Sequence, residues 1–206
     1  MLKKIVLASN NPGKLREFAA LFAPLNIEVL PQSSFNIPEA EEPHPTFIEN
    51  ALVKARHAAR LSGLPALADD SGLCVAALNG APGVQSARYD QLFSGEAKSD
   101  ARNDVRNCAR LLEALRDTTD RRAHYYCVLV LLRHADDPQP LIAEGEWHGE
   151  ILDAPRGDGG FGYDPLFFLP ELGQTSAEIP ASLKNTLSHR AFAFRQLFDR
   201  LYGEAA

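Results

Sequence analysis

The chain has 206 residues, of which 45% are hydrophobic and 23% are charged, so it can bury a core and is not disordered by composition. Its formal net charge of −6 argues against a nucleic-acid partner but allows a small anion where a few lysines converge. No apolar run reaches the ~18 residues that span a bilayer, so no membrane partner is expected. We predict a single domain over residues 1–206.

Three cysteines, Cys74, Cys108 and Cys127, form no CxxC pair and stand in apolar or helical surroundings. They are interpreted as reduced core thiols, which suits a cytoplasmic protein. The first eight residues are interpreted as a strand, because the apolar run is too short for a signal peptide.

The first half of the chain mixes strands and helices. An N-cap at Asn11 with Pro12 behind it begins one helix, and a capping box at Thr46 and Glu49 begins the next. A turn is expected at Ser71-Gly72. The predicted strands are 3–8, 27–30, 64–70 and 73–77, the helices are 12–23 and 47–62, and a loop covers 31–45.

The second half continues without strict alternation of strand and helix, which favours an α/β fold around a mixed sheet. A helix over about 101–115 should turn Val105, Cys108, Leu112 and Leu115 inward. In the second of two strands, Trp147 marks a buried face, opposite a charged face interpreted as solvated. The other predictions are strands at 125–132 and 141–152, a turn at 134–140, a glycine-rich loop at 157–163 and a helix at 191–202.

The segment Ser9–Lys14 lies at a predicted junction between a strand and a helix. Free backbone N–H groups and the positive end of the helix dipole make such a junction suitable for phosphate. Gly13 permits close approach of the backbone, and Lys14 supplies a cation. An ordinary capped turn with a surface lysine is the alternative, because the pattern is not the Walker phosphate loop.

Two aspartates, Asp69 and Asp70, close an otherwise apolar run. Neighbouring strand residues point to opposite faces, so at most one of the two should face a given cleft. A carboxylate at a strand end suits Mg²⁺, which takes one or two carboxylates together with substrate phosphates. A turn is the alternative. Glu39 and Glu41 of the preceding loop are expected to be solvated.

Asn50 and Lys54 are four residues apart on a predicted helix and therefore share one side of it. We expect this pair to reach toward bound phosphates. The alternative is a lysine whose stem packs on the helix while its charge stays in water.

Two later segments suit a nucleobase. In the glycine-rich loop, Phe161 is expected to stack on a base and Asp164 to hydrogen-bond its edge. Donors would come from the segment just before the last helix, with a helix-cap or surface role as the alternative for His189. These donors are Lys184, Ser188, His189 and Arg190.

Together these motifs resemble the inosine triphosphate pyrophosphatase family, which removes non-standard purine nucleoside triphosphates from the nucleotide pool. They stand in the family's order, cover nearly the whole chain and show no departure, and the bacterial branch is the most similar. The matching segments are Ser9–Lys14, Thr46–Ala51 with Lys54-Ala55, Ala68–Leu73, Ala81–Val84, Ser86–Tyr89, Gly159–Pro165 and Ser188–Arg190.

The resemblance implies a homodimer with an α/β fold, in which an elongated mixed β-sheet with flanking helices forms two lobes around a central cleft. It implies that Asp70 is the general base and a ligand of Mg²⁺, with Glu42 as a further ligand. The positions that match substrate-binding residues are Ser9, Asn10, Asn11, Pro12, Gly13, Lys14, Lys54, Ser71, Phe161, Gly162, Tyr163, Asp164, Lys184, His189 and Arg190.

The predicted activity is hydrolysis of ITP, dITP and XTP to the monophosphate and pyrophosphate. Asp70 would take a proton from the water that attacks the α-phosphorus, and Lys14 and Lys54 would hold the charge of the leaving pyrophosphate. Donors in segment 184–190 would favour the 6-keto group over the amino group of adenine. Two alternatives stay open: a non-catalytic nucleotide-binding module, and a pyrophosphatase for modified pyrimidine triphosphates.

Overall fold

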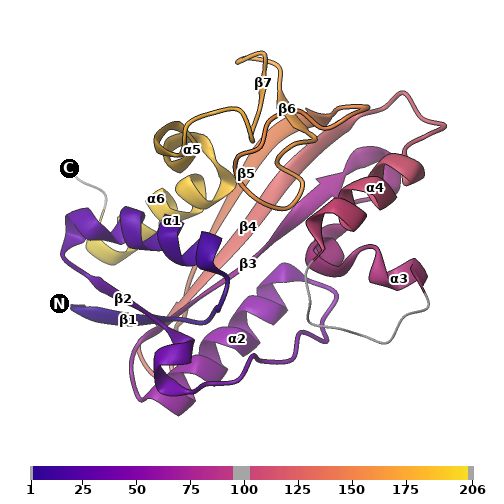
Figure 1. Cartoon of the computed structure of the whole chain (residues 1–206). Helices are drawn as coiled ribbons and strands as arrows, with labels where there is room; N and C mark the ends of the chain where they lie inside the picture. The colour runs from indigo at the N-terminus through magenta and orange to yellow at the C-terminus, as the bar shows by residue number, and fades with distance from the viewer. Residues whose placement is uncertain (1, 95–102, 204–206) are drawn as a thin grey trace. The chain divides into compact units, whose positions relative to one another are not determined.

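The computed structural model describes residues 2–94 and 103–203 (Figure 1). Over these residues seven strands form one sheet in the order β2-β1-β3-β4-β5-β6-β7. The strands are β1 Lys4–Leu7, β2 Glu28–Pro31, β3 Ala66–Val75, β4 Arg122–Leu132, β5 Leu141–Ile151, β6 Phe167–Leu169 and β7 Gln174–Thr175. The α-helices are α1 Pro12–Phe22, α2 Phe47–Ser62, α3 Gln91–Ser94, α4 Asp104–Ala114, α5 Ala181–Leu187 and α6 His189–Tyr202.

The sheet is mixed, as the sequence predicted. Strand β1 runs parallel to both β2 and β3, whereas β6 is antiparallel to β5 and β7. Helices flank the sheet, which confirms the predicted α/β class. Within the described residues, no helix has the length and apolar character that crossing a bilayer requires.

By its internal contacts the chain divides into two compact units. Unit 1 is formed from residues 2–70, 127–145 and 189–203, and unit 2 from residues 71–94, 103–126 and 146–188. We predicted a single domain over residues 1–206, and that stays a prediction.

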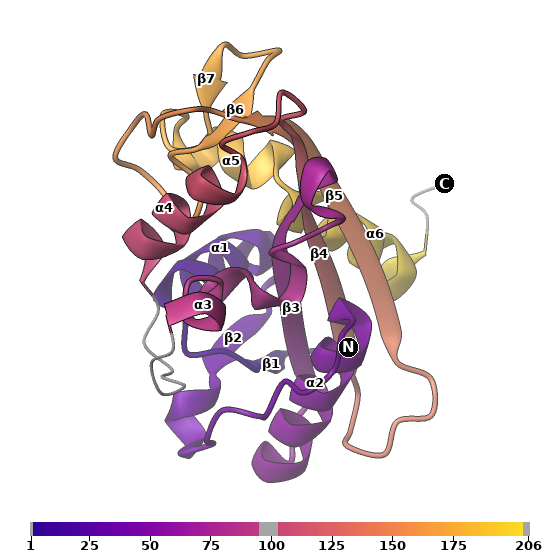
Figure 2. The same cartoon turned by 90° about the vertical axis from the view of Figure 1, so that its right-hand side faces the viewer.

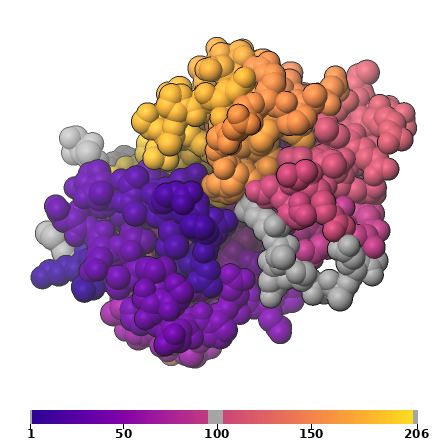
Figure 3. Space-filling view, viewed as in Figure 1, coloured from indigo at the N-terminus to yellow at the C-terminus, as the bar shows by residue number. Residues whose placement is uncertain are grey.

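The core of unit 1 follows from the alternation of strand side chains. One face of β1, β3 and β4 carries apolar residues such as Leu7, Leu67 and Leu129, and these pack against Phe18 of α1 and Leu197 of α6. Helix α2 covers the opposite face with its alanines (Figures 1 and 2). The N-terminal strands and helices form one continuous surface, coloured indigo to violet in Figure 3.

A glycine brings α6 close to the sheet in unit 1. A Cβ added at Gly145 of β5 would lie 2.1 Å from the carbonyl oxygen of His189, the first residue of α6. The start of α6 therefore packs directly on the strand backbone, which a larger residue would prevent.

The core of unit 2 is rich in aromatic residues. The ring centroids of Tyr125, Trp147 and Phe167 lie 4.7 to 6.5 Å apart. Leu111 of α4 and Leu115, just after that helix, belong to the same core. The predicted face of β5 is confirmed, because Trp147 is buried whereas the charged residues between the buried positions are exposed. These exposed residues are Glu144, Glu146, His148 and Glu150.

Two predictions of local structure are wrong. Ser71-Gly72 forms no turn but continues β3, because a place in the middle of the sheet supplies backbone partners that outweigh local turn preference. Val105 does not face inward, since it is 80% exposed while Asn107 and Leu111 take the buried side of α4. The predicted start of that helix near Ala101 lies outside the described residues.

Candidate active site

The turn between β1 and α1 has the predicted cap. The Asn11 side chain accepts hydrogen bonds from the backbone N–H groups of Gly13 (2.8 Å) and Lys14 (3.3 Å), and the Ser9 hydroxyl oxygen accepts one from the Asn11 N–H. The expectation that these N–H groups are free for phosphate is therefore wrong for this structure, because the cap supplies their acceptor. A phosphate at this helix end would have to replace the Asn11 side chain.

Lys14 points from α1 to Asp69 in the interior of β3. Its Nζ donates to the Asp69 carboxylate (2.7 Å) and to the Asp69 carbonyl oxygen (3.2 Å). Leu67 is the strand partner of Leu7, the last residue of β1, and the Asp69 carbonyl lies two residues beyond Leu67. The Lys14 ammonium therefore donates where a backbone N–H would donate if β1 continued. The side chain is 14% exposed, and the alternative of a surface lysine is wrong.

Lys54 reaches the same strand from α2 and joins two acidic side chains. Its Nζ donates to Glu42 (2.8 Å), to the Asp70 carboxylate (2.7 Å) and to the Asp69 carbonyl oxygen (3.0 Å). An ammonium group has three N–H bonds, and these contacts use all of them. The alternative of a lysine with its charge in water is wrong, and the contacts place Lys54 between two carboxylates.

Asn50 holds the loop that carries Glu42. Its side chain accepts from the His44 N–H and donates to the His44 carbonyl, both at 3.0 Å. This bidentate contact fixes the backbone two residues after Glu42. Glu39 and Glu41 of the same loop are exposed, as predicted.

Asp69 and Asp70 point to opposite faces of β3, as strand alternation predicts. Asp69 is fully buried against α1 and α6, where its two oxygens accept from Lys14 and from the Arg190 Nε (2.6 Å). Asp70 faces α2 and accepts from Lys54. The turn that was the alternative for this pair does not form.

Asp70 lies in a buried environment beside a charged lysine. Burial raises the pKa of Asp70, and the positive charges of Lys54 and Lys14 oppose that rise. Its Oδ2 is buried and has no hydrogen-bond partner among the residues that the structure describes. Burial alone would lower the pKa of Lys54, but Asp70 and Glu42 outweigh it and hold that pKa above the ordinary value.

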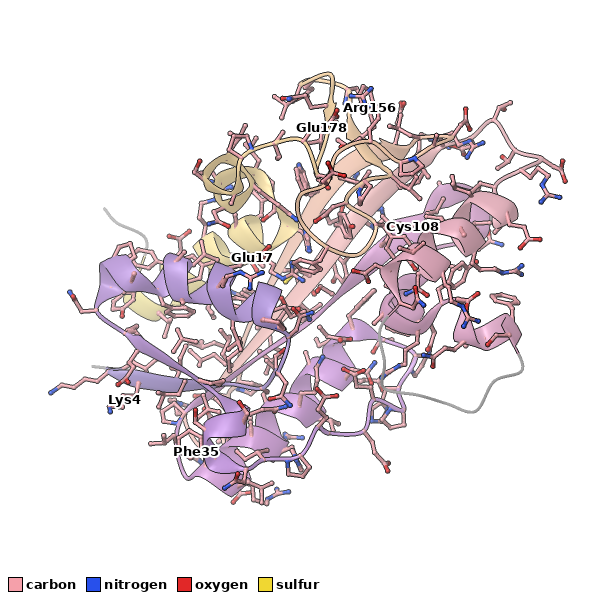
Figure 4. The ribbon with its side chains drawn as sticks, viewed as in Figure 1. Lys4, Glu17, Phe35, Cys108, Arg156 and Glu178 are labelled. Atoms are coloured by element: carbon pink, nitrogen blue, oxygen red, sulfur yellow. The ribbon has the colours of Figure 1, made fainter. Side chains whose placement is uncertain are left out.

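His189 and Arg190 both lie in unit 1, and Arg190 contacts the charged residues around Asp69. Arg190 is buried, with its Nε on Asp69 and its Nη1 on Glu17 (3.0 Å), which Figure 4 labels on α1. The two carboxylates outweigh the effect of burial and hold the pKa of Arg190 above its ordinary value. His189 is 2% exposed, so the surface alternative for it is wrong.

Asp164 is the centre of the glycine-rich loop in unit 2. One carboxylate oxygen accepts from the Ser176 hydroxyl (2.8 Å) and the Tyr125 hydroxyl (3.3 Å), and the other accepts from the Phe161 N–H (2.8 Å) and the Lys184 Nζ (2.5 Å). Four donors fill the acceptor sites of a carboxylate. In this structure Asp164 shapes the loop and does not present a free acceptor to a base.

The glycines of this loop allow its close packing. Gly160 has a φ of 73°, and a Cβ there would lie 2.0 Å from Asp164. The Gly162 N–H donates to Asp104 of α4 (2.7 Å), and the Cys108 thiol, labelled in Figure 4, donates to the Gly162 carbonyl. The hydroxyl of Tyr163 donates to the Ser86 carbonyl.

One aromatic ring of the glycine-rich loop, that of Phe161, lies near the ammonium group of Lys184. Phe161 is half-buried, and the Lys184 Nζ lies 5.1 Å from its ring centroid. The predicted donor segment is therefore divided, because Lys184 belongs to unit 2 whereas His189 and Arg190 belong to unit 1. Ser71, at the first position of unit 2, is half-buried.

The supporting residues Glu17, Asp104 and Ser176 were not predicted from the sequence. Glu17 follows Lys14 by one helical turn, and that spacing was an available signal. Ser176 and Asp104 have no comparable local signal. Among residues 2–94 and 103–203, no three His, Cys, Asp or Glu side chains gather as a metal centre.

Comparison with known proteins decides the family. The model of the Ham1 family matches residues 5–200. The chain belongs to the Ham1 family. Ham1 membership confirms the resemblance to the inosine triphosphate pyrophosphatases.

Similar proteins match the chain over almost its whole length. A protein of Aromatoleum aromaticum, named dITP/XTP pyrophosphatase, is 70% identical over 98% of both chains. One of Ralstonia nicotianae with the same name is 66% identical over 97% of both. The solved structure of a HAM1 protein from Coxiella burnetii is 49% identical, covers 98% of both chains and has a TM-score of 0.86. The similarity to the solved HAM1 structure thus covers 98% of the chain.

Proposed function

We propose that the chain hydrolyses non-standard purine nucleoside triphosphates, among them dITP, XTP and ITP, to the monophosphate and pyrophosphate. The names of the relatives support this activity. The observation that carries it is the buried Asp70 carboxylate, which shares Lys54 with Glu42 and leaves one oxygen without a protein partner among the described residues.

We propose Asp70 and Glu42 as the protein ligands of Mg²⁺. Both carboxylates already meet at the Lys54 ammonium, and oxygen ligands are what Mg²⁺ prefers. The ion pairs of Lys14, Lys54 and Arg190 join these three cationic side chains to four carboxylates, and a bound cation would offset the excess negative charge and attract a triphosphate. Bound Mg²⁺ would neutralise phosphate charge and polarise the phosphorus.

The protein's own part in the reaction follows from these contacts. Asp70 takes the proton of the attacking water on its Oδ2, which has no hydrogen-bond partner among the described residues. Lys14 has two contacts and one further N–H bond with which to hold a phosphate oxygen. Lys54 keeps Glu42 and Asp70 together. We therefore assign phosphate contact to Lys14 and the spacing of the carboxylates to Lys54.

We propose that the glycine-rich loop of unit 2 receives the base. Phe161 offers a half-buried ring for stacking, with Lys184 beside it. The matching positions Gly162, Tyr163 and Asp164 hold the loop in shape.

The assembly is proposed to be a cytoplasmic homodimer. The resemblance supports the dimer, and the three cysteines, all free, suit a reducing compartment. Light scattering of the purified protein tests the dimer: a mass of one chain at micromolar concentration would exclude it.

Pyrophosphate release across a panel of nucleotides tests the activity. The panel contains ITP, dITP, XTP, ATP, GTP and modified pyrimidine triphosphates, each with Mg²⁺. We expect pyrophosphate with the first three and little with ATP or GTP. Binding of ITP without release would identify a nucleotide-binding module, and a preference for the pyrimidines would support the other alternative.

A further inference from the structure

Arg190 and Lys14 share one buried carboxylate. The guanidinium Nε lies 2.6 Å from one oxygen of Asp69, and the Lys14 Nζ lies 2.7 Å from the other. The Asp69 side chain is fully buried and that of Arg190 is 5% exposed. The two cations thus hold the aspartate from both ends.

We propose that Arg190 is a positioning residue for the triphosphate site: by holding Asp69 it fixes the acceptor on which Lys14 rests. The inference rests on the proposed function, since it concerns how Lys14 meets the substrate. It assigns Arg190 to the phosphate side of the reaction and not to recognition of the base.

The geometry of the guanidinium supports this assignment. Its Nε and Nη1 bind two different carboxylates, Asp69 and Glu17, from β3 and α1. Such a fork fixes both elements at once, which a single ammonium group cannot do. Lys14 and Glu17 lie one turn apart on α1. By binding Glu17 and Asp69, Arg190 therefore fixes both the helix that carries Lys14 and the carboxylate that accepts from Lys14.

Charge sharing gives the reason. A buried aspartate facing Lys14 alone would form a full ion pair and oppose transfer of that lysine's charge to a phosphate. Arg190 binds the other oxygen of Asp69 throughout the reaction and neutralises part of its negative charge. Asp69 then holds Lys14 in place without fully neutralising the positive charge of the lysine.

The experiment compares Arg190→Gln and Arg190→Lys with wild type. Three quantities are measured with Mg²⁺: kcat/KM for ITP, kcat/KM for ATP, and the Kd of inorganic triphosphate by calorimetry. Arg195→Ala is the matched control, because Arg195 lies on the same helix and is exposed. Circular dichroism checks that each variant is folded.

We expect Arg190→Gln to lower both kcat/KM values by the same factor, ~10-fold or more, and to weaken triphosphate binding to a similar extent. Arg190→Lys should recover part of each loss. The control should match wild type. In an Asp69→Asn background, Arg190→Gln should add less than ~3-fold, because both variants act through one contact.

A loss confined to ITP, with triphosphate binding unchanged, would overturn the inference and make Arg190 a reader of the base. Losses that add fully to those of Asp69→Asn would also overturn it. If Arg190→Gln does not fold, Arg190→Lys and the double variant still decide. Absence of pyrophosphate release by wild type would instead refute the proposed function, while the triphosphate measurement still tests the positioning role.

Discussion

Lys14 and Lys54 donate to the same acceptor, the carbonyl oxygen of Asp69, although they come from helices on opposite faces of the sheet. The shared carbonyl lies just past the end of β1, where the strand ladder stops. Their remaining contacts differ, since Lys14 binds Asp69 and Lys54 binds Asp70 and Glu42. Two lysines that look alike in the sequence therefore have different expected roles.

Replacing each lysine should separate these roles. Lys14→Ala should lower kcat/KM for ITP by ~10- to 150-fold at any Mg²⁺ concentration, because a charge-assisted hydrogen bond to phosphate is lost. Lys54→Ala should lower the Mg²⁺ concentration required for half-maximal activity, because Glu42 and Asp70 then lose the ammonium that neutralises them. A magnesium titration of both variants makes the comparison. The control is Lys4→Ala at the exposed end of β1, and identical titration curves for the two variants would contradict the division.

Asp70→Asn should remove most turnover while the protein stays folded. Loss of a general base costs ~10²- to 10⁴-fold in kcat. Because the folded-state pKa of Asp70 is raised, its contribution to stability is present below the ordinary pKa and is lost as pH rises. A neutral Asn avoids that loss, and Lys54 keeps Glu42 and the Asp69 carbonyl as partners, so the melting temperature at pH 7 should fall less than in Asp69→Asn. Turnover within a few-fold of wild type would exclude Asp70 as the base.

Asp69→Asn should behave in the opposite way. Its buried carboxylate pairs with two cations, and breaking a buried pair costs about 3 to 5 kcal/mol of unfolding free energy. The effect on kcat should be milder than that of Asp70→Asn, since Asp69 faces away from the proposed base. Thermal melts and initial rates on the same preparations check both points. An Asp69→Asn protein as stable as wild type would show that these pairs contribute little.

Phe161→Ala should weaken both ITP and ATP by a similar factor. Stacking is insensitive to ring substituents and is worth about 1 to 3 kcal/mol per base, so kcat/KM should fall ~5- to 150-fold for each. Phe192→Ala, which removes a partly exposed ring on α6, is the control. If neither nucleotide is affected, Phe161 does not contact the base.

Asp137 should make stability depend on pH. Its buried carboxylate accepts from the Arg133 guanidinium and from the backbone N–H groups of Arg133 and Gln139, and the Arg133 hydrogen bond holds its pKa well below the usual range. With a lowered folded-state pKa, this stability is present above the ordinary Asp pKa and is lost as pH falls through the folded value. Asp137→Asn should lower the melting temperature at pH 7 by about 2 to 5 °C. The difference from wild type should shrink below about pH 4, and a constant gap at every pH would contradict the assignment.

The sequence by itself determined the features that depend on neighbours along the chain. Asn11 caps α1 because its side chain reaches N–H groups two and three residues on. Asp69 and Asp70 face opposite ways because strand side chains alternate. The mixed sheet also followed from the order of predicted strands and helices, and the family followed from the resemblance of motifs spread along the chain.

Only the tertiary structure decided which charges meet. Arg190 binds Asp69 across 121 residues, and Ser176 and Tyr125 converge on Asp164 from different elements. No local pattern carries such pairings, because they depend on which helix packs on which face of the sheet. For the same reason Ser71-Gly72, a turn by local preference, became part of β3: sheet hydrogen bonds from distant strands outweigh a preference that extends over four residues.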